Sequence, residues 1–194
     1  MTWIDYLVDG LAHITDLGGY DHMIYLIALV AIYDYREIKQ IIWLVTAFTV
    51  GHSLTLVLAG LDIIHPNRGL IEFLIPVTIL ITALSNLRHA QRVKEPVPHH
   101  GWRYLLAVAF GLIHGMGFSS YFRMIVDRDE SIVQPLLFFN LGVELGQVGI
   151  VLVFMLISFM IQSLFKTRQR DWIIFFSGFP AGLALMLCIE TWPF

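Results

Sequence analysis

Long apolar segments constrain this chain more than any other feature of its sequence. Each is close to or longer than the roughly 20 residues that an α-helix needs to cross the hydrocarbon core of a bilayer. Hydrophobic residues make up 57% of the 194 positions and charged residues only 14%, against about 25% in a typical soluble domain. The pattern predicts an all-α polytopic membrane protein with six transmembrane helices, at about residues 19–35, 38–61, 70–87, 102–122, 133–165 and 172–192.

The N-terminal residues 1–17 are expected to form a short helix that lies in the membrane interface, because hydrophobic side chains alternate there with acids. Gly18 and Gly19 would break this helix before the first span begins. The whole chain, 1–194, is predicted to form a single membrane domain. Its linker-like stretch is 93–101, which contains two prolines.

Basic residues predict the orientation of the spans. One set of alternate loops carries nine of them, and the opposite set carries three. The positive-inside rule therefore places the nine-residue side in the cytoplasm and both termini outside, which is the periplasm for a bacterial inner membrane. The first set is Arg36, Lys39, Arg88, Arg92, Lys94, Arg103, Lys166, Arg168 and Arg170, and the second is Arg68, Arg123 and Arg128.

Other features of the composition exclude several classes of function. The single cysteine, Cys188, excludes a disulfide framework and a metal cage built from thiolates. The net charge of −3 is too small to suggest a nucleic-acid partner. We find no nucleotide-binding motif, so any transport would be passive or would depend on a partner protein.

Ionisable and polar side chains inside the predicted spans need an explanation, since each charge costs about 2.5–3.5 kcal/mol on insertion scales. At a rise of 1.5 Å per residue, His22, His52 and His114 all lie roughly 18–20 Å from the cytoplasmic ends of their helices. They therefore share one depth in the outer half of the bilayer. Asp21 precedes the first of them.

The fifth span carries Asn140, Glu144 and Gln147 with the spacing i, i+4, i+7, which puts the three side chains on one face of a helix. Glu144 reaches the depth of the histidines only if this long helix tilts or projects into the cytoplasm, which we assume. Glycines flank His52 and His114 and would let the helices approach closely.

Imidazoles and carboxylates that converge at one depth have the composition of a site for a divalent metal. We expect Asp21, His22, His52, His114 and Glu144 to be its ligands, and Asn140 and Gln147 to be ligands or to orient them. His13 stays open between a ligand and a solvated side chain of the interfacial helix. The alternative for the whole set is structural hydrogen bonding between neighbouring helices.

Four motifs, in matching order, resemble the HupE/UreJ family. They are the Asp21-His22 element, AFTVGHSLTL (47–56), FGLIHGMGF (110–118) and FNLGVELGQ (139–147). The resemblance implies a small polytopic protein linked to the maturation of nickel hydrogenase and urease, in a family proposed to contain nickel permeases. The family signature has five residues between His and Asp-His, whereas seven separate His13 from Asp21 here.

The sequence is compatible with three functions. The favoured one is a permease for a divalent metal, nickel first, with zinc, cobalt or copper as alternatives. Its expected partners are the metal, the lipid bilayer, and metallochaperones or proteins of metalloenzyme maturation. An intramembrane zinc hydrolase could use the same residues, with Glu144 or Asp21 as general base. The third is an accessory protein that binds metal without transporting it.

Overall fold

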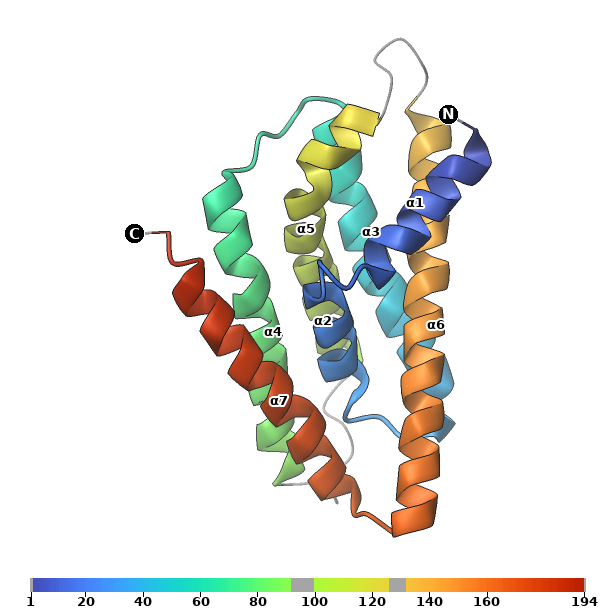
Figure 1. Ribbon diagram of the computed structural model, residues 1–194, viewed down its shortest axis with the longest axis vertical. Helices are drawn as coiled ribbons and strands as arrows, with labels where there is room; N and C mark the ends of the chain where they lie inside the picture. The colour runs from blue at the N-terminus through green and yellow to red at the C-terminus, as the bar shows by residue number, and fades with distance from the viewer. Residues whose placement is uncertain (1, 92–99, 126–131, 194) are drawn as a thin grey trace.

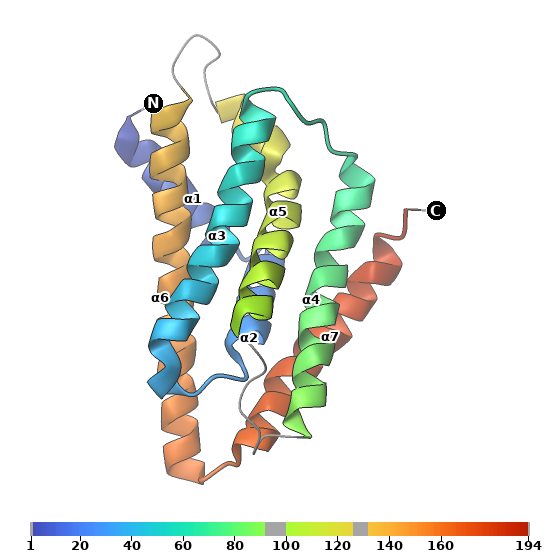
Figure 2. The same ribbon diagram turned by 180° about the vertical axis from the view of Figure 1, so that it is seen from behind.

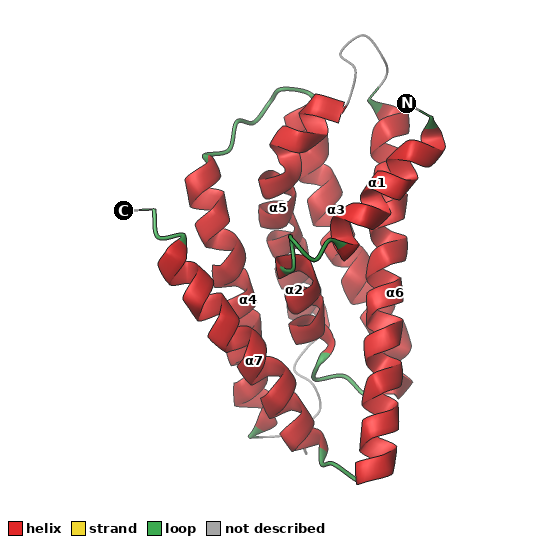
Figure 3. Cartoon of the chain, in the orientation of Figure 1, coloured by secondary structure: helices red, strands yellow, loops and turns green. Residues whose placement is uncertain are grey.

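The computed structural model describes residues 2–91, 100–125 and 132–193, and the described residues form helices joined by short connections (Figures 1 and 3). The elements are α1 (Trp3–Thr15), α2 (Asp21–Val30), the 3-10 helix η1 (Tyr35–Glu37), α3 (Ile38–Gly60), α4 (Arg68–Ala90), α5 (His100–Ile125), α6 (Val133–Phe165) and α7 (Gln169–Glu190). Most of the predicted linker 93–101 lies outside the described residues.

Five helices of the described chain, α3 to α7, are long and apolar enough to cross a membrane. They coincide within a few residues with the last five predicted spans, and α6 has the predicted bounds 133–165. Hydropathy therefore identified these helices correctly. Successive long helices run in opposite directions, so that the ends carrying Arg36, Lys39, Arg88, Arg103 and Lys166 lie at one end of the bundle (Figure 1).

The first predicted span, 19–35, is shorter in the structure. Its helix, α2, has ten residues, which corresponds to about 15 Å. Asp34 ends the segment because its side chain caps η1 together with Glu37 in a reciprocal capping box. At the end of α2, the side chain of Asn86 donates a hydrogen bond to the carbonyl of Ala28, which satisfies one of the last carbonyls of the helix.

A short helix is confirmed at the N-terminus, where Thr2 caps α1. α1 packs along the upper part of α6, and the chain turns at residues 16–20 before α2 continues downward (Figure 1). Tyr6, Gly10 and Ile14 are buried, whereas Val8 is about half exposed on the opposite face.

Three helix pairs make the most extensive contacts: α3 with α5, α1 with α6, and α4 with α7 (Figures 1 and 2). Glycines bring the backbones together in the first two pairs. A Cβ atom on Gly51 would overlap the carbonyl oxygen of Val108, and one on Gly111 would overlap that of Phe48. Gly10 and Gly142 have the same relation to carbonyl groups across the α1–α6 contact. Small residues at these positions fit the way helices pack in membranes.

Replacing Gly111 with alanine should destabilise the bundle, because the new methyl group would overlap the backbone of α3 at Phe48. Overpacking of this kind typically costs about 1–3 kcal/mol. We expect a lower midpoint of thermal unfolding for the purified protein in detergent. Gly149→Ala is the matched control, since nothing lies within 4 Å of a Cβ atom there. Equal unfolding midpoints for the two variants would contradict the proposed packing.

Candidate metal centre

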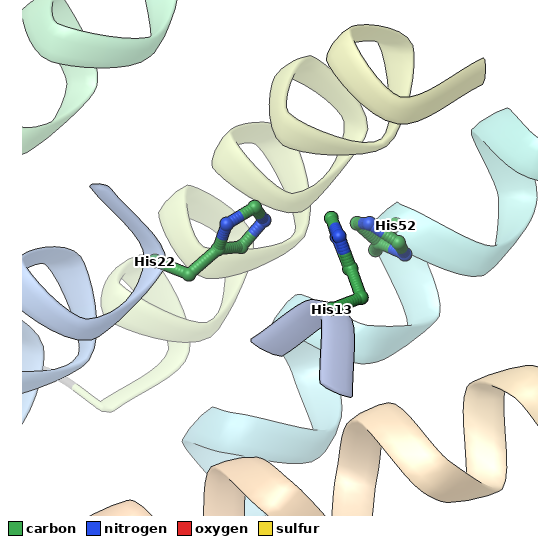
Figure 4. Close-up of side chains that lie close together, drawn as sticks. All are labelled: His13, His22 and His52. Atoms are coloured by element: carbon green, nitrogen blue, oxygen red, sulfur yellow. The ribbon is translucent and has the colours of Figure 1, made fainter. Parts of the chain in front are cut away.

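Three histidines from three different helices converge in the middle of the bundle. His13 comes from the last turn of α1, His22 from the first turn of α2 and His52 from α3. One ring nitrogen of each can be chosen so that all three lie within 4.8 Å of one another. Figure 4 shows His13 between the other two rings, and its ring centroid is 4.7 Å from that of His22 and 5.8 Å from that of His52.

His114 of α5 extends this cluster. Its ring centroid lies 5.2 Å from that of His22, and its side chain is buried. Nδ1 of His114 lies 2.9 Å from the carbonyl oxygen of Phe110. Because a carbonyl can only accept, this contact assigns the proton to Nδ1 and leaves the lone pair on Nε2. In a histidine that binds metal, the ring nitrogen that does not contact the metal usually donates a hydrogen bond in this way, which fixes the tautomer.

Asp21 supplies the carboxylate nearest to the cluster. Its Oδ1 lies 3.2 Å from Nδ1 of His22 and also accepts a hydrogen bond from the backbone N–H of that residue. A carboxylate beside an imidazole can orient the ring or bind a metal directly. Asp21 therefore lies next to the site that the sequence predicted it would join.

Several buried ring nitrogens lack hydrogen-bond partners within the described part of the chain. Both nitrogens of His52 are in this state, as are Nε2 of His13, His22 and His114, whereas Nδ1 of His22 faces the carboxylate of Asp21. A buried polar group left without a partner costs about 1–3 kcal/mol. Contacts between the helices therefore leave at least one nitrogen of each of these four imidazoles unsatisfied among the described residues, and a bound metal would take one nitrogen from each ligand.

Aromatic rings enclose the cluster. Phe118 lies 3.8 Å from His13 between ring centroids, and Phe48 lies 5.1 Å from His114. Tyr25 is also 5.1 Å from His114 and is fully buried. These rings leave the imidazoles in an apolar environment, where the attraction between a metal and its ligands is stronger than in water.

A bound transition metal would draw the histidines closer together. Metal–nitrogen bonds of about 2.0–2.1 Å limit the distance between two ligating nitrogens to about 4.2 Å. The observed spread of up to 4.8 Å exceeds this limit by a small amount. Small rotations of the side chains would close the site.

Glu144 lies outside the histidine cluster, at the contact between α3 and α6. Its Oε1 accepts a hydrogen bond of 2.6 Å from the hydroxyl of Thr46, and its Oε2 has no partner in the described residues. Gln147 pairs in the same way with Thr49, whose hydroxyl donates to Oε1 of Gln147 at 2.7 Å. Asn140 donates to the carbonyl of Leu136. These side chains form a polar row along α3 and α6.

The structure thus brings together His22, His52 and His114, three of the five predicted ligands, and puts Asp21 beside them. His13, which the sequence left open, belongs to the cluster. The sequence did not identify the aromatic rings around it or the threonine partners of the polar row. Thr46 and Thr49 lie about one helical turn apart on α3, and this spacing in the sequence could have predicted one polar face of the helix.

Comparison with known proteins supports the resemblance seen in the motifs. A family model described as HupE / UreJ protein matches residues 1–192. The family is a membrane family whose members usually serve metal uptake in connection with urease and hydrogenase maturation. No curated protein and no solved structure matches the chain.

Replacement of a cluster histidine should weaken metal binding. We expect His13→Ala, His22→Ala and His52→Ala each to lower the affinity for Ni²⁺ at least about tenfold, the lower bound for loss of an outer partner of a ligand. Isothermal titration calorimetry of the purified protein with Ni²⁺ measures this affinity. His65→Ala is the control, because His65 is exposed in the loop after α3. Unchanged affinity in all three cluster variants would rule out this site.

The stability of a leucine variant of His52 separates a metal site from structural packing. His52→Leu removes two ring nitrogens without hydrogen-bond partners and keeps an apolar side chain at a fully buried position. We expect the metal-free protein to unfold at the same or a higher temperature, because an unsatisfied polar group is removed. A lower unfolding temperature of the metal-free variant would indicate that His52 stabilises the fold.

Proposed function

This chain belongs to the HupE/UreJ family, and we propose that it is a permease that carries a divalent transition metal, nickel first, across the bacterial inner membrane. One observation carries the proposal: two buried imidazoles and one half-buried imidazole, from three helices, converge where the chain is interrupted between α1 and α2. Transporters commonly bind their substrates near the middle of the membrane, at the ends of interrupted helices.

In this proposal α1 does not lie in the interface, as the sequence suggested, but makes the first of six crossings together with α2. Their 13 and ten residues correspond to about 20 Å and 15 Å, and the sum exceeds the roughly 30 Å of a hydrocarbon core. The turn at residues 16–20 would then lie within the membrane. His13 and His22 flank this turn, so a small movement of either helix would change the distance between two ligands.

The donor set favours a borderline metal. Neutral imidazoles suit nickel, zinc, cobalt and copper, and the described cluster contains no thiolate that would hold a soft metal tightly. A permeating ion must bind well enough to enter and weakly enough to leave. His13, His22 and His52 would hold the ion first, with His114 and Asp21 beside them.

A cavity of about 250 Å³ supports an entrance next to Asp21. It lies between the α1–α2 turn and the neighbouring parts of α4 and α7, and Gly18, Tyr20, Asp21, Glu72 and Thr191 contribute to its lining. The carboxylate of Asp21 would attract a cation there, whereas that of Glu72 is paired with Arg68 at 2.7 Å. The ion would exchange its water there for the carboxylate of Asp21 and the imidazole of His22.

The onward route in this proposal follows the polar row between α3 and α6. Thr46 precedes His52 by six residues on α3, which places it about 9 Å nearer the cytoplasmic end of that helix. Glu144, held by Thr46, would receive the ion after the histidines and would act as a second ligand position. Asn86, which hydrogen-bonds the end of α2, is assigned a structural role.

The orientation follows the distribution of basic residues, with both termini in the periplasm. The metal would then enter from the periplasmic side and leave towards proteins of metalloenzyme maturation in the cytoplasm. The carrier itself has no catalytic residue in this proposal.

Metal flux into proteoliposomes tests the function. We expect the wild-type protein to carry Ni²⁺ to a fluorescent chelator inside the vesicles faster than empty vesicles do. His22→Ala and His52→Ala should lower the rate at least about tenfold because each removes a ligand, and His65→Ala should not change it. Stoichiometric binding without flux would instead identify an accessory protein. Metal-dependent hydrolysis of a lipid amide without flux would identify an enzyme.

Glu144→Gln tests the second ligand position. The substituted amide can still accept the hydrogen bond from Thr46, but it lacks the negative charge. We expect the maximal flux to fall several-fold while equilibrium binding of Ni²⁺ to the histidines stays unchanged. Glu190→Gln, at the end of α7, is the control for loss of a carboxylate. Equal losses of binding and flux in Glu144→Gln would place Glu144 in the first site instead.

A further inference from the structure

A second cavity lies on the other side of α5 from the polar row. It has a volume of about 230 Å³ and is bounded by α2, α4 and the first turns of α5. Arg103 and Trp102 contribute to its wall from α5, Ser85 and Ile81 from α4, and Tyr25 from α2. The proposed transport of metal gives this cavity no role.

Arg103 is the charged group of the cavity. Its guanidinium hydrogen-bonds with the hydroxyl of Tyr33, a residue that is 2% exposed. A guanidinium stays charged at any accessible pH, and a phenol provides an oxygen atom but no negative charge. Within the described residues, no carboxylate forms an ion pair with Arg103. An anionic group bound in the cavity would neutralise the guanidinium of Arg103.

A second buried polar group points to a ligand in the same place. The side chain of Tyr25 is fully buried, lines the cavity, and its hydroxyl has no hydrogen-bond partner in the described part of the chain. The cost of leaving such a group unsatisfied is about 1–3 kcal/mol. A polar ligand, or water carried with it, would satisfy the hydroxyl.

The rim of the cavity carries exposed apolar side chains. Ile81 is 47% exposed and Trp102 is 61% exposed, and both lie on helices that are apolar enough to cross the membrane. Trp102 belongs to the first turn of α5, where an indole is expected at the level of the lipid headgroups. Leu29 and Leu106 provide apolar walls further in. The opening therefore combines a cation, an interfacial tryptophan and an apolar interior.

We propose that this cavity binds an anionic phospholipid of the adjoining leaflet, with Arg103 holding the phosphate. The charge-assisted hydrogen bonds of a guanidinium suit phosphate oxygens, and the hydroxyl of Ser85 stands at the rim to donate a further one. The first methylene groups of an acyl chain would lie against Leu106. Basic pockets between transmembrane helices are a known setting for such headgroups. This site does not depend on the proposed metal transport.

Native mass spectrometry of the protein in neutral detergent tests the proposal. We expect phosphatidylglycerol to stay bound to the wild-type protein and phosphatidylcholine to bind at least tenfold more weakly. Arg103→Gln should lower retention of phosphatidylglycerol at least tenfold. Arg88→Gln, which removes an exposed basic residue from the last turn of α4, should leave retention unchanged.

Further arms of the experiment keep the result interpretable. Ser85→Phe narrows the opening from an exposed position and should lower retention even if Arg103→Gln fails to fold. Inorganic phosphate at millimolar concentration should not displace the lipid, because it lacks the apolar contacts. Displacement by phosphate would indicate a site for a soluble anion. Equal retention of the two lipids, or unchanged retention in Arg103→Gln and Ser85→Phe, would overturn the proposal.

Discussion

The contact between the backbones of α3 and α5 is the interaction on which the buried histidines depend. Within a bilayer, helices gain little from the hydrophobic effect when they associate, so they rely on close van der Waals packing. Gly51 and Gly111 allow this packing because neither has a side chain to separate the two backbones. His52 follows the first glycine, and His114 lies three residues beyond the second. The same contact therefore brings two helices together and sets the positions of two imidazoles.

The interruption between α1 and α2 supplies the other half of the cluster. A continuous helix would carry His13 and His22 about 13.5 Å apart along its axis, since His22 is nine positions after His13 and each position adds 1.5 Å. The turn at residues 16–20 instead brings their ring centroids to 4.7 Å. This arrangement leaves several ring nitrogens without hydrogen-bond partners among the described residues. A fold tolerates such a cost most readily at a functional site.

Hydropathy and helical rise predicted much of this arrangement. Five long helices were found because their apolar runs exceed the thickness of a membrane, and the depths of His22, His52 and His114 follow from the regular rise of a helix. Local capping at Asp34 shortened the first span, and hydropathy does not detect a cap of this kind.

The position of His13 could not be predicted, because sequence spacing gives no distance across a turn. The spacing of Asn140, Glu144 and Gln147 correctly indicated one face of α6. It could not identify the partners of these side chains, because Thr46 and Thr49 reach them only through tertiary packing.

Two polar regions lie between the histidine cluster and the end of the bundle that carries most of the basic residues, and they differ in charge. The row with Glu144 lies between α3 and α6, whereas the cavity with Arg103 is lined by α2, α4 and α5. Figure 2 shows α6 and α4 on opposite sides of the bundle. A divalent cation ~10 Å from an unneutralised guanidinium is repelled by ~3 kcal/mol at an effective dielectric constant of ~20. Inward movement past Glu144 avoids this repulsion. A phospholipid phosphate beside Arg103 would also cancel most of it, so the lipid and the metal can occupy the same protein without competing electrostatically.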